Sequence, residues 1–127
     1  MVQKNYLISF IFVLLFTGSV FFLGYYANQS SQEPSEEVTI RIIAKQFEYE
    51  PENITVSFGV KVKLILTSAD VVHGFQIEEY NIKDVQIRNG EETVVTFVAN
   101  IRGEFIFFCD VFCGVGHADH WGRLRVV

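Results

Sequence analysis

Apolar and polar residues alternate along most of the chain after residue 37, with the two-residue period of a β-strand. The clearest stretch is residues 60–67, in which Val60, Val62 and Leu64 are separated by lysines. No segment of this region keeps the 3.6-residue period of a helix. The alternation predicts strands at residues 38–45, 54–57, 60–67, 75–78, 82–87, 93–99, 105–109 and 123–127.

Two glycine-containing sites mark turns between these strands. Gly59 separates the second and third strands, and Asn89 with Gly90 separates the fifth and sixth. Asn-Gly favours a hairpin because both residues tolerate positive φ. Many short strands in a body of residues 38–127 are typical of a small antiparallel sandwich or barrel. The sequence therefore predicts an all-β fold, with at most a turn of helix in its loops.

The amino-terminal region has a different pattern. Residues 6–26 contain no charge and no proline, and a helix of this length spans about 31 Å, the thickness of a bilayer's hydrocarbon core. The run is longer than a signal-peptide core and ends in Tyr25 and Tyr26, which suit the bilayer interface. It predicts a single transmembrane anchor in preference to a cleaved signal.

Charges beside the anchor predict its orientation. Lys4 precedes it, whereas Glu33, Glu36 and Glu37 are the first charges after it. The positive-inside bias therefore predicts that residues 1–5 are cytoplasmic and that the body is extracytoplasmic, in the periplasm or on the outer face of the cell membrane. Residues 27–37 are polar, contain a proline and predict a tether.

Length and charge narrow the possible functions. The chain has 127 residues, with 10 basic and 15 acidic side chains and a net charge of −5, so it has room for one domain. An acidic body argues against a nucleic-acid partner. The sequence also contains no glycine-rich phosphate loop, no GxSxG and no HExxH motif, which removes the common nucleotide-binding, hydrolase and zinc-protease functions.

Residues with metal-binding chemistry are concentrated in one segment. This segment contains both cysteines, Cys109 and Cys113, and two of the three histidines, His117 and His120. The third histidine, His73, lies earlier in the chain. Thiolate and imidazole ligands favour copper, zinc or iron–sulfur over calcium or magnesium. The segment joins the last two predicted strands, so it lies at one end of a sandwich, where a neighbouring strand can deliver His73.

The same segment is compatible with four simpler roles. Cys109 and Cys113 could form a disulfide, but this leaves the histidines unexplained. A structural zinc site usually has a longer gap between its cysteine and histidine pairs. A thioredoxin-type thiol–disulfide or copper-delivery protein needs more chain after Cys113 than the sequence has. Any one histidine, His120 above all, could be an ordinary loop residue.

The segment resembles the dinuclear copper (CuA) domain of cytochrome c oxidase subunit II, a cupredoxin, and is most similar to the short one-helix form in B-type haem–copper oxidases. The family pattern is a histidine followed by C-x-x-x-C-G-x-x-H-x-x-M, and here it falls on His73, Cys109, Cys113, His117 and His120. The segments 46–51, 70–75 and 103–105 are similar as well. The resemblance covers residues 38–127 and implies a cupredoxin-like Greek-key sandwich.

The resemblance implies a role for each residue of the pattern. Cys109 and Cys113 would bridge two coppers, His73 would bind one copper and His117 the other. The backbone carbonyl of Val111 would complete the second copper. Phe47 and Tyr49 are similar to an aromatic segment that lies on the family's surface near its electron donor.

The position of His120 departs from the family, which has a methionine there. The only methionine is Met1, so the body offers no thioether ligand. Imidazole is a harder donor than thioether and should favour oxidised copper, lowering the reduction potential. Asp119 is an alternative axial oxygen. Two histidines on one copper could also give a mononuclear centre.

The resemblance implies a copper subunit through which electrons enter a membrane terminal oxidase. It would accept electrons from cytochrome c or a similar small donor and pass them to haem in oxidase subunit I, and it would not itself reduce oxygen. Aromatic residues are expected to exclude water from the copper, namely Phe75, Phe108, Phe112 and Trp121. The alternatives are a membrane-anchored mononuclear cupredoxin, a copper carrier or assembly factor, and a thiol–disulfide oxidoreductase.

Overall fold

The structure is a computed structural model, and it describes Phe22 and residues 36–127. The chain divides into two units, residues 1–33 and 34–127. Apart from Phe22, the predicted anchor and nearly all of the predicted tether lie outside the described residues. Within the described residues, no helix is long and apolar enough to span a bilayer.

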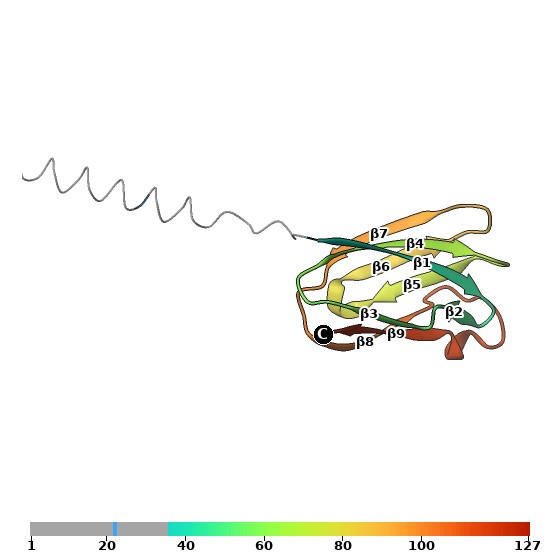
Figure 1. Cartoon of the computed structure of the whole chain (residues 1–127). Coiled ribbons are helices and arrows are strands. Elements are labelled where there is room, and N and C mark those ends of the chain that lie inside the picture. Colours follow the sequence, from blue (N-terminus) through green and yellow to red (C-terminus); the bar gives the residue numbers. More distant parts are fainter. Residues whose placement is uncertain (1–21, 23–35) are drawn as a thin grey trace, which may run out of the picture. The chain divides into compact units, whose positions relative to one another are not determined.

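The body consists of strands joined by loops (Figure 1). All eight predicted strands are confirmed, with ends shifted by at most two residues. The strands are β1 (Glu37–Lys45), β2 (Glu48–Glu50), β3 (Asn53–Val56), β4 (Lys61–Ser68), β5 (His73–Ile77), β6 (Ile82–Ile87), β7 (Thr93–Val98), β8 (Gly103–Phe108) and β9 (Trp121–Val126). Single 3-10 turns, η1 (Glu78–Tyr80) and η2 (His117–Asp119), occupy two loops.

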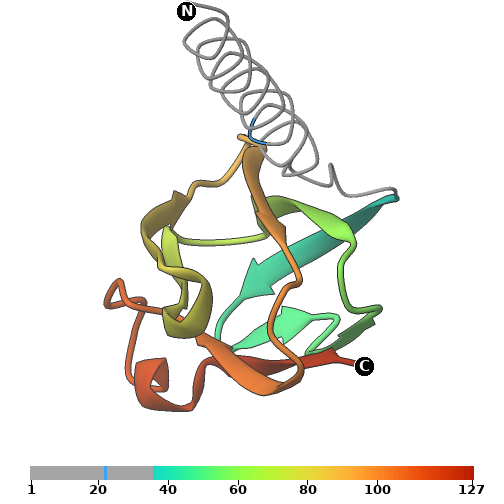
Figure 2. The same ribbon diagram turned by 90° about the vertical axis from the view of Figure 1, so that its left-hand side faces the viewer.

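The strands form two sheets that face one another (Figures 1 and 2). The first sheet has the strand order β2-β1-β4-β7, and the second has the order β3-β9-β8-β5-β6. Each sheet buries one face: Ile42, Val62 and Leu64 of the first sheet meet Phe75 and Phe107 of the second in a shared apolar core. The all-β sandwich predicted from the alternation is therefore confirmed.

The antiparallel arrangement predicted from the sequence is wrong for two strand pairs. Strand β1 runs parallel to β4, and β3 runs parallel to β9. The chain reverses between β1 and β2 and again between β3 and β4, so β4 returns beside β1 in the same direction. Gly59, at the second reversal, has a φ of 86°, as expected for a glycine turn.

Asn89 and Gly90 do not form the predicted hairpin. Strands β6 and β7 on either side of them belong to different sheets, so this connection crosses between the layers. Gly90 has a φ of 79°, which confirms a tight turn but not strand pairing. Local turn chemistry fixes the reversal, whereas the packing of both layers decides which strands pair.

Five strand termini lie at one end of the sandwich. The parallel pair β1 and β4 end there, with Ala44 opposite Ser68. Strand β5 begins there, β8 ends there and β9 begins there, since β8 is antiparallel to both β5 and β9. In Figure 1 this end lies opposite the carboxyl terminus and carries the long β8–β9 loop.

Candidate metal centre

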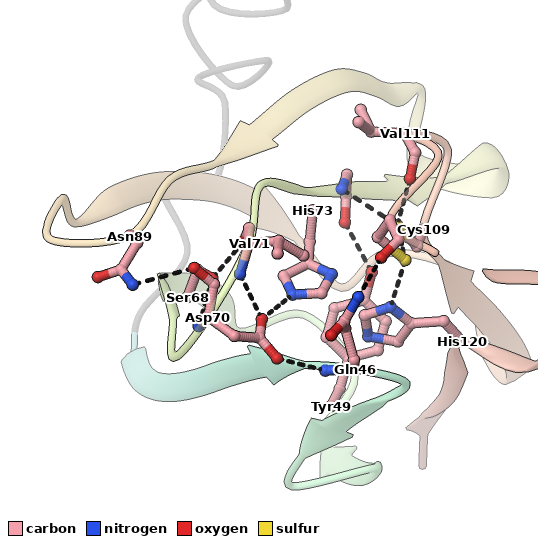
Figure 3. A network of polar contacts seen from close by, with 12 residues as sticks. Gln46, Tyr49, Ser68, Asp70, Val71, His73, Asn89, Cys109, Val111 and His120 are labelled. Atoms are coloured by element: carbon pink, nitrogen blue, oxygen red, sulfur yellow. Dashed lines mark hydrogen bonds and ion pairs between the residues drawn. The ribbon is translucent and has the colours of Figure 1, made fainter. Parts of the chain in front are cut away.

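The histidine and cysteine side chains that could bind a metal lie together at this end of the sandwich (Figure 3). His73 is the first residue of β5, and Cys109 directly follows β8. Cys113 and His120 lie in the β8–β9 loop, where the backbone N–H of Cys109 donates to the carbonyl of His120 at 3.0 Å. The antiparallel contact of β5 with β8 thus brings a histidine 36 positions earlier in the sequence to the cysteine loop.

Four side chains form a buried cluster. The ligand atoms of His73, Cys109, Cys113 and His120 all lie within 4.8 Å of one another. The two sulfurs are 3.6 Å apart, and His120 Nδ1 is 3.5 Å from Cys113 Sγ. The four residues are at most 6% exposed. Two of the sequence-predicted histidines and both cysteines are therefore adjacent in space and shielded from water.

The remaining candidate ligands lie beside this cluster. His117 is half-buried, and its Nδ1 is 3.6 Å from Cys113 Sγ, but it is outside the group of four. The carbonyl of Val111 accepts from Cys109 Sγ at 3.0 Å. Asp119 is exposed and is also outside the group.

Gly74 permits the close approach of β5 to the cysteine loop. A Cβ at this position would lie 2.7 Å from the backbone nitrogens of Asp110 and Val111, closer than real Cβ atoms come. The backbone N–H of Gly74 also donates to Cys109 Sγ at 3.2 Å. Because Gly74 has no side chain, β5 can approach closely enough for its backbone to donate a hydrogen bond to Cys109 Sγ.

The loop backbone also lies directly against the ring of Phe47. A Cβ on Gly114 would be 2.9 Å from this ring, and one on Gly116 would be 2.4 Å from it. Gly114 has a φ of 139°, a conformation that only glycine adopts readily. Phe47 of the β1–β2 connection thus packs against the backbone of the cysteine loop. Glycine is needed at position 114 for the backbone conformation, and at positions 114 and 116 because a side chain would collide with the Phe47 ring.

His73 is held by a carboxylate that the sequence analysis did not single out. Its Nε2 lies 2.6 Å from Asp70 Oδ1. Burial raises the pKa of Asp70, but hydrogen bonds from His73 and from the backbone N–H groups of Gln46 and Val71 outweigh it and hold the pKa below its usual value. The only sequence signal for this contact is a three-residue spacing, which is common among unrelated residues.

Burial sets the protonation of the cluster when no metal is bound. Removal from water, together with the neighbouring Cys109 sulfur, raises the pKa of the Cys113 thiol to about 12. Burial and the adjacent His73 lower the pKa of His120 to about 4. At neutral pH, His120 is therefore an uncharged imidazole with a free lone pair, and Cys113 must lose a proton to bind a metal.

Two aromatic expectations are corrected by the structure. Tyr49, expected on the surface, is only 2% exposed; its hydroxyl donates to the carbonyl of Gly74 and its ring lies 4.1 Å from that of His120. Burial and the nearby Cys109 raise the pKa of this phenol. Phe112, expected to exclude water, is 78% exposed, whereas Phe75 is fully buried as expected.

The donor set fits a soft or borderline metal ion. Both cysteines are free thiols, and their 3.6 Å separation is much longer than the bond of about 2.05 Å in a disulfide. Metal–thiolate bonds of about 2.3 Å allow two sulfurs on one ion to lie up to about 4.6 Å apart. His73 Nδ1 and His120 Nε2 are buried and have no hydrogen-bond partner among the described residues. His73 Nδ1 therefore retains a lone pair that a metal would satisfy, and His120 offers Nδ1, the nitrogen beside Cys113 Sγ.

The fold and the site define a small all-β protein that gathers thiols and imidazoles at one end of a sandwich. The cupredoxin-like domain family matches residues 11–117 of the chain. Cytochrome c oxidase subunit 2 of Thermus thermophilus is 34% identical to it over 95 residues, which is 75% of this chain and 70% of that protein. The chain therefore belongs to the cupredoxin-like family and, within it, to the CuA-type subunit II of cytochrome c oxidase.

Further comparisons agree with the fold. A second T. thermophilus sequence of the same name is also 34% identical over 95 residues, and the match spans 75% of this chain but 56% of that protein. The periplasmic domain of subunit II of cytochrome oxidase from Bradyrhizobium japonicum has a TM-score of 0.67 at 22% identity, covering 74% of this chain and 86% of that domain. A chain of a haem–copper terminal oxidase dimer has a TM-score of 0.64 at 22% identity, with full coverage of both chains. Family and donor set together indicate copper as the metal.

Metal affinity should increase with pH. Because the Cys113 thiol is protonated near neutrality and His120 is already neutral, binding displaces at least one thiol proton. We expect the apparent affinity for Cu(I) to rise about tenfold per pH unit between about pH 6 and 8, measured by competition with a chromophoric chelator. Cys113→Ser should lower both the affinity and this slope, and an affinity independent of pH would contradict the thiol assignment.

Gly74→Ala should disrupt the site. Its methyl group would meet the backbone of Asp110 and Val111, and such overpacking typically costs about 1–3 kcal/mol. We expect this loss in denaturant unfolding followed by the fluorescence of Trp121, together with weaker Cu(I) binding. Gly90→Ala is the control, since no described atom lies within 4 Å of its Cβ; it should cost backbone strain but retain copper affinity.

Proposed function

We propose that this chain is the copper subunit through which electrons enter a membrane terminal oxidase. The observation that carries the proposal is the buried cluster of two thiols and two imidazoles in a chain of the oxidase subunit II family. Copper held there would supply one-electron chemistry. The chain's own residues bind the metal, keep it dry and fix its surroundings, so that little rearrangement accompanies each transfer.

The centre proposed here is dinuclear. Cys109 and Cys113 would bridge two coppers, with His73 on one and His117 on the other. The carbonyl of Val111 would complete the copper held by His117, and His120 would take the axial position beside His73. The 3.6 Å contacts of Cys113 Sγ with both Cys109 Sγ and His117 Nδ1 support this assignment.

One observation favours a mononuclear alternative. The group of four contains His120 and omits His117, so a single copper could be bound by two sulfurs and two buried imidazoles. Such a chain would be a mononuclear cupredoxin, a copper carrier or an assembly factor. The two possibilities differ in the number of metal ions per chain.

We further propose a single-pass location in the cell membrane. Residues 6–26 would form the anchor, residues 27–37 the tether, and residues 38–127 the copper domain on the extracytoplasmic side, with residues 1–5 in the cytoplasm. The likeness to a periplasmic subunit II domain supports this side. The partners would be cytochrome c or a similar donor and a haem-bearing subunit I, to which electrons pass.

Copper stoichiometry tests the centre directly. The full chain, loaded with copper, should bind two ions, and its electron-spin spectrum should show one unpaired electron shared between two equivalent nuclei. Copper quantification against protein concentration provides the count. One tightly held copper would support the mononuclear alternative, and absence of copper binding with a readily formed disulfide would support a thiol–disulfide enzyme. Co-purification with a haem-bearing partner tests the oxidase assignment.

His120→Met should raise the reduction potential of the copper centre. Thioether is a softer donor than imidazole and stabilises reduced copper, and the body contains no other methionine. Potentiometric titration of the visible spectrum measures the shift. Ala118→Met is the control, because it adds a thioether at an exposed position of η2 and should leave the potential unchanged. An unchanged or lower potential in His120→Met would show that His120 is not a ligand.

A further inference from the structure

Hydrogen bonds beside the cluster converge on the carboxylate of Asp70 (Figure 3). Its Oδ1 lies 2.6 Å from both His73 Nε2 and the backbone nitrogen of Val71. Its Oδ2 accepts from the backbone N–H of Gln46 at 2.8 Å. One side chain thus joins the β4–β5 loop, the first residue of β5 and the β1–β2 connection.

The carboxylate determines which nitrogen of His73 carries the proton. An ionised carboxylate can only accept hydrogen bonds, so His73 Nε2 must be the donor. A neutral imidazole carries a single N–H, and Nδ1 is then left with its lone pair. His73 Nδ1 is buried without a hydrogen-bond partner among the described residues, and His73 belongs to the cluster of four donors. With the proton on Nε2, the lone pair of His73 lies on Nδ1, where a metal bound by the cluster could accept it.

Gln46 extends the same network to the cysteine loop. Its backbone N–H binds Asp70, while its side-chain Nε2 donates to the carbonyl of Cys113 at 2.6 Å. The histidine and the cysteine loop are thus connected through two residues that are not metal-ligand candidates. A shift of either loop would disturb the hydrogen bonds of the other.

Asp70 is itself fixed by its backbone. Its N–H donates to Ser68 Oγ at 3.2 Å, and its carbonyl accepts from Asn89 Nδ2 at 3.0 Å. Ser68 ends β4 and Asn89 follows β6. The backbone of Asp70 is therefore held by both sheets of the sandwich, and the backbone N–H groups of Gln46 and Val71 hold its carboxylate in addition to His73.

We propose that Asp70 is a positioning residue that fixes His73 as the Nε2–H tautomer and, with Gln46, holds the histidine and cysteine loops in register before metal binds. This inference rests on the proposed function only in assuming that the cluster binds copper. Carboxylate partners of metal-binding histidines orient the ring and strengthen the ligand, and their loss typically lowers metal affinity about 10- to 100-fold.

Nitrogen NMR of the metal-free full chain, labelled with ¹⁵N-histidine, tests the tautomer. His73 should carry its proton on Nε2, with a strongly deshielded proton that exchanges slowly with water. Asp70→Asn retains the shape but not the charge, so it should shift this proton resonance upfield. Asp70→Ala should increase its exchange rate further and mix the two tautomers. A proton on Nδ1 in the wild type, or an Nε2–H resonance unaffected by Asp70→Ala, would overturn the proposal.

Copper affinity provides the second measurement. Asp70→Ala should weaken Cu(I) binding about 10- to 100-fold, with a smaller loss for Asp70→Asn, which also serves if Asp70→Ala does not fold. Asp84→Asn is the matched control. Asp84 is an exposed residue of β6 with a φ of 56°, a conformation that asparagine tolerates, so the same charge change should alter neither the NMR signal nor the affinity.

Gln46→Ala distinguishes the contribution of the Gln46 backbone, which binds Asp70, from that of its side chain, which binds the cysteine loop. It retains the backbone N–H to Asp70 but removes the amide from the Cys113 carbonyl. The His73 resonance should stay unchanged while Cu(I) affinity falls; unchanged affinity would contradict the role of Gln46. If the chain failed to bind copper, the proposed function would fail while the NMR result still decided the tautomer.

Discussion

Burial of four metal-type donors at one end of the sandwich is the constraint on which the rest of this structure depends. Buried polar groups normally cost free energy unless they are hydrogen-bonded, yet His73 Nδ1 and His120 Nε2 have no such partner among the described residues. The surrounding packing holds the donors in place: Gly74 contacts the loop backbone and the Tyr49 ring covers His120. An unpaired buried nitrogen such as His73 Nδ1 costs stability, and it leaves a lone pair that copper would satisfy.

Much of the fold followed from the sequence because strand burial has a period of two. The eight predicted strands are present, but β2 was missed, since three residues are too few for alternation to be recognised. Pairing was predicted less well. Two parallel pairs and the crossing at Asn89 depend on which layer each strand joins, and that depends on contacts between residues far apart in the sequence.

The candidate site also contains residues that the sequence predicted and residues that it did not. Rare residue types at fixed spacing identified the cysteines and histidines. Their chemistry pointed to copper, zinc or iron–sulfur, and the family resemblance selected copper among these. The supporting residues carry no such signal, because Asp70 and Gln46 are common residue types. Asp70 contacts His73 at a spacing of three that many unrelated residues share, and Gln46 contacts Asp70 and Cys113 at separations of 24 and 67 positions. The solvent exposure of the aromatic side chains could not be predicted either, because local sequence does not reveal that Tyr49 is buried while Phe112 is exposed to water.

The stacking of the cysteine loop on Phe47 has a consequence for protein engineering. The glycines of the loop leave no room for a Cβ above this ring, so the two segments form one interlocking unit despite their distance in the sequence. If the cysteine loop alone were grafted onto another sandwich, it would lose the Phe47 ring against which it packs. A transplant would have to carry the β1–β2 connection with it, and a larger ring at position 47 would need a compensating change in the loop.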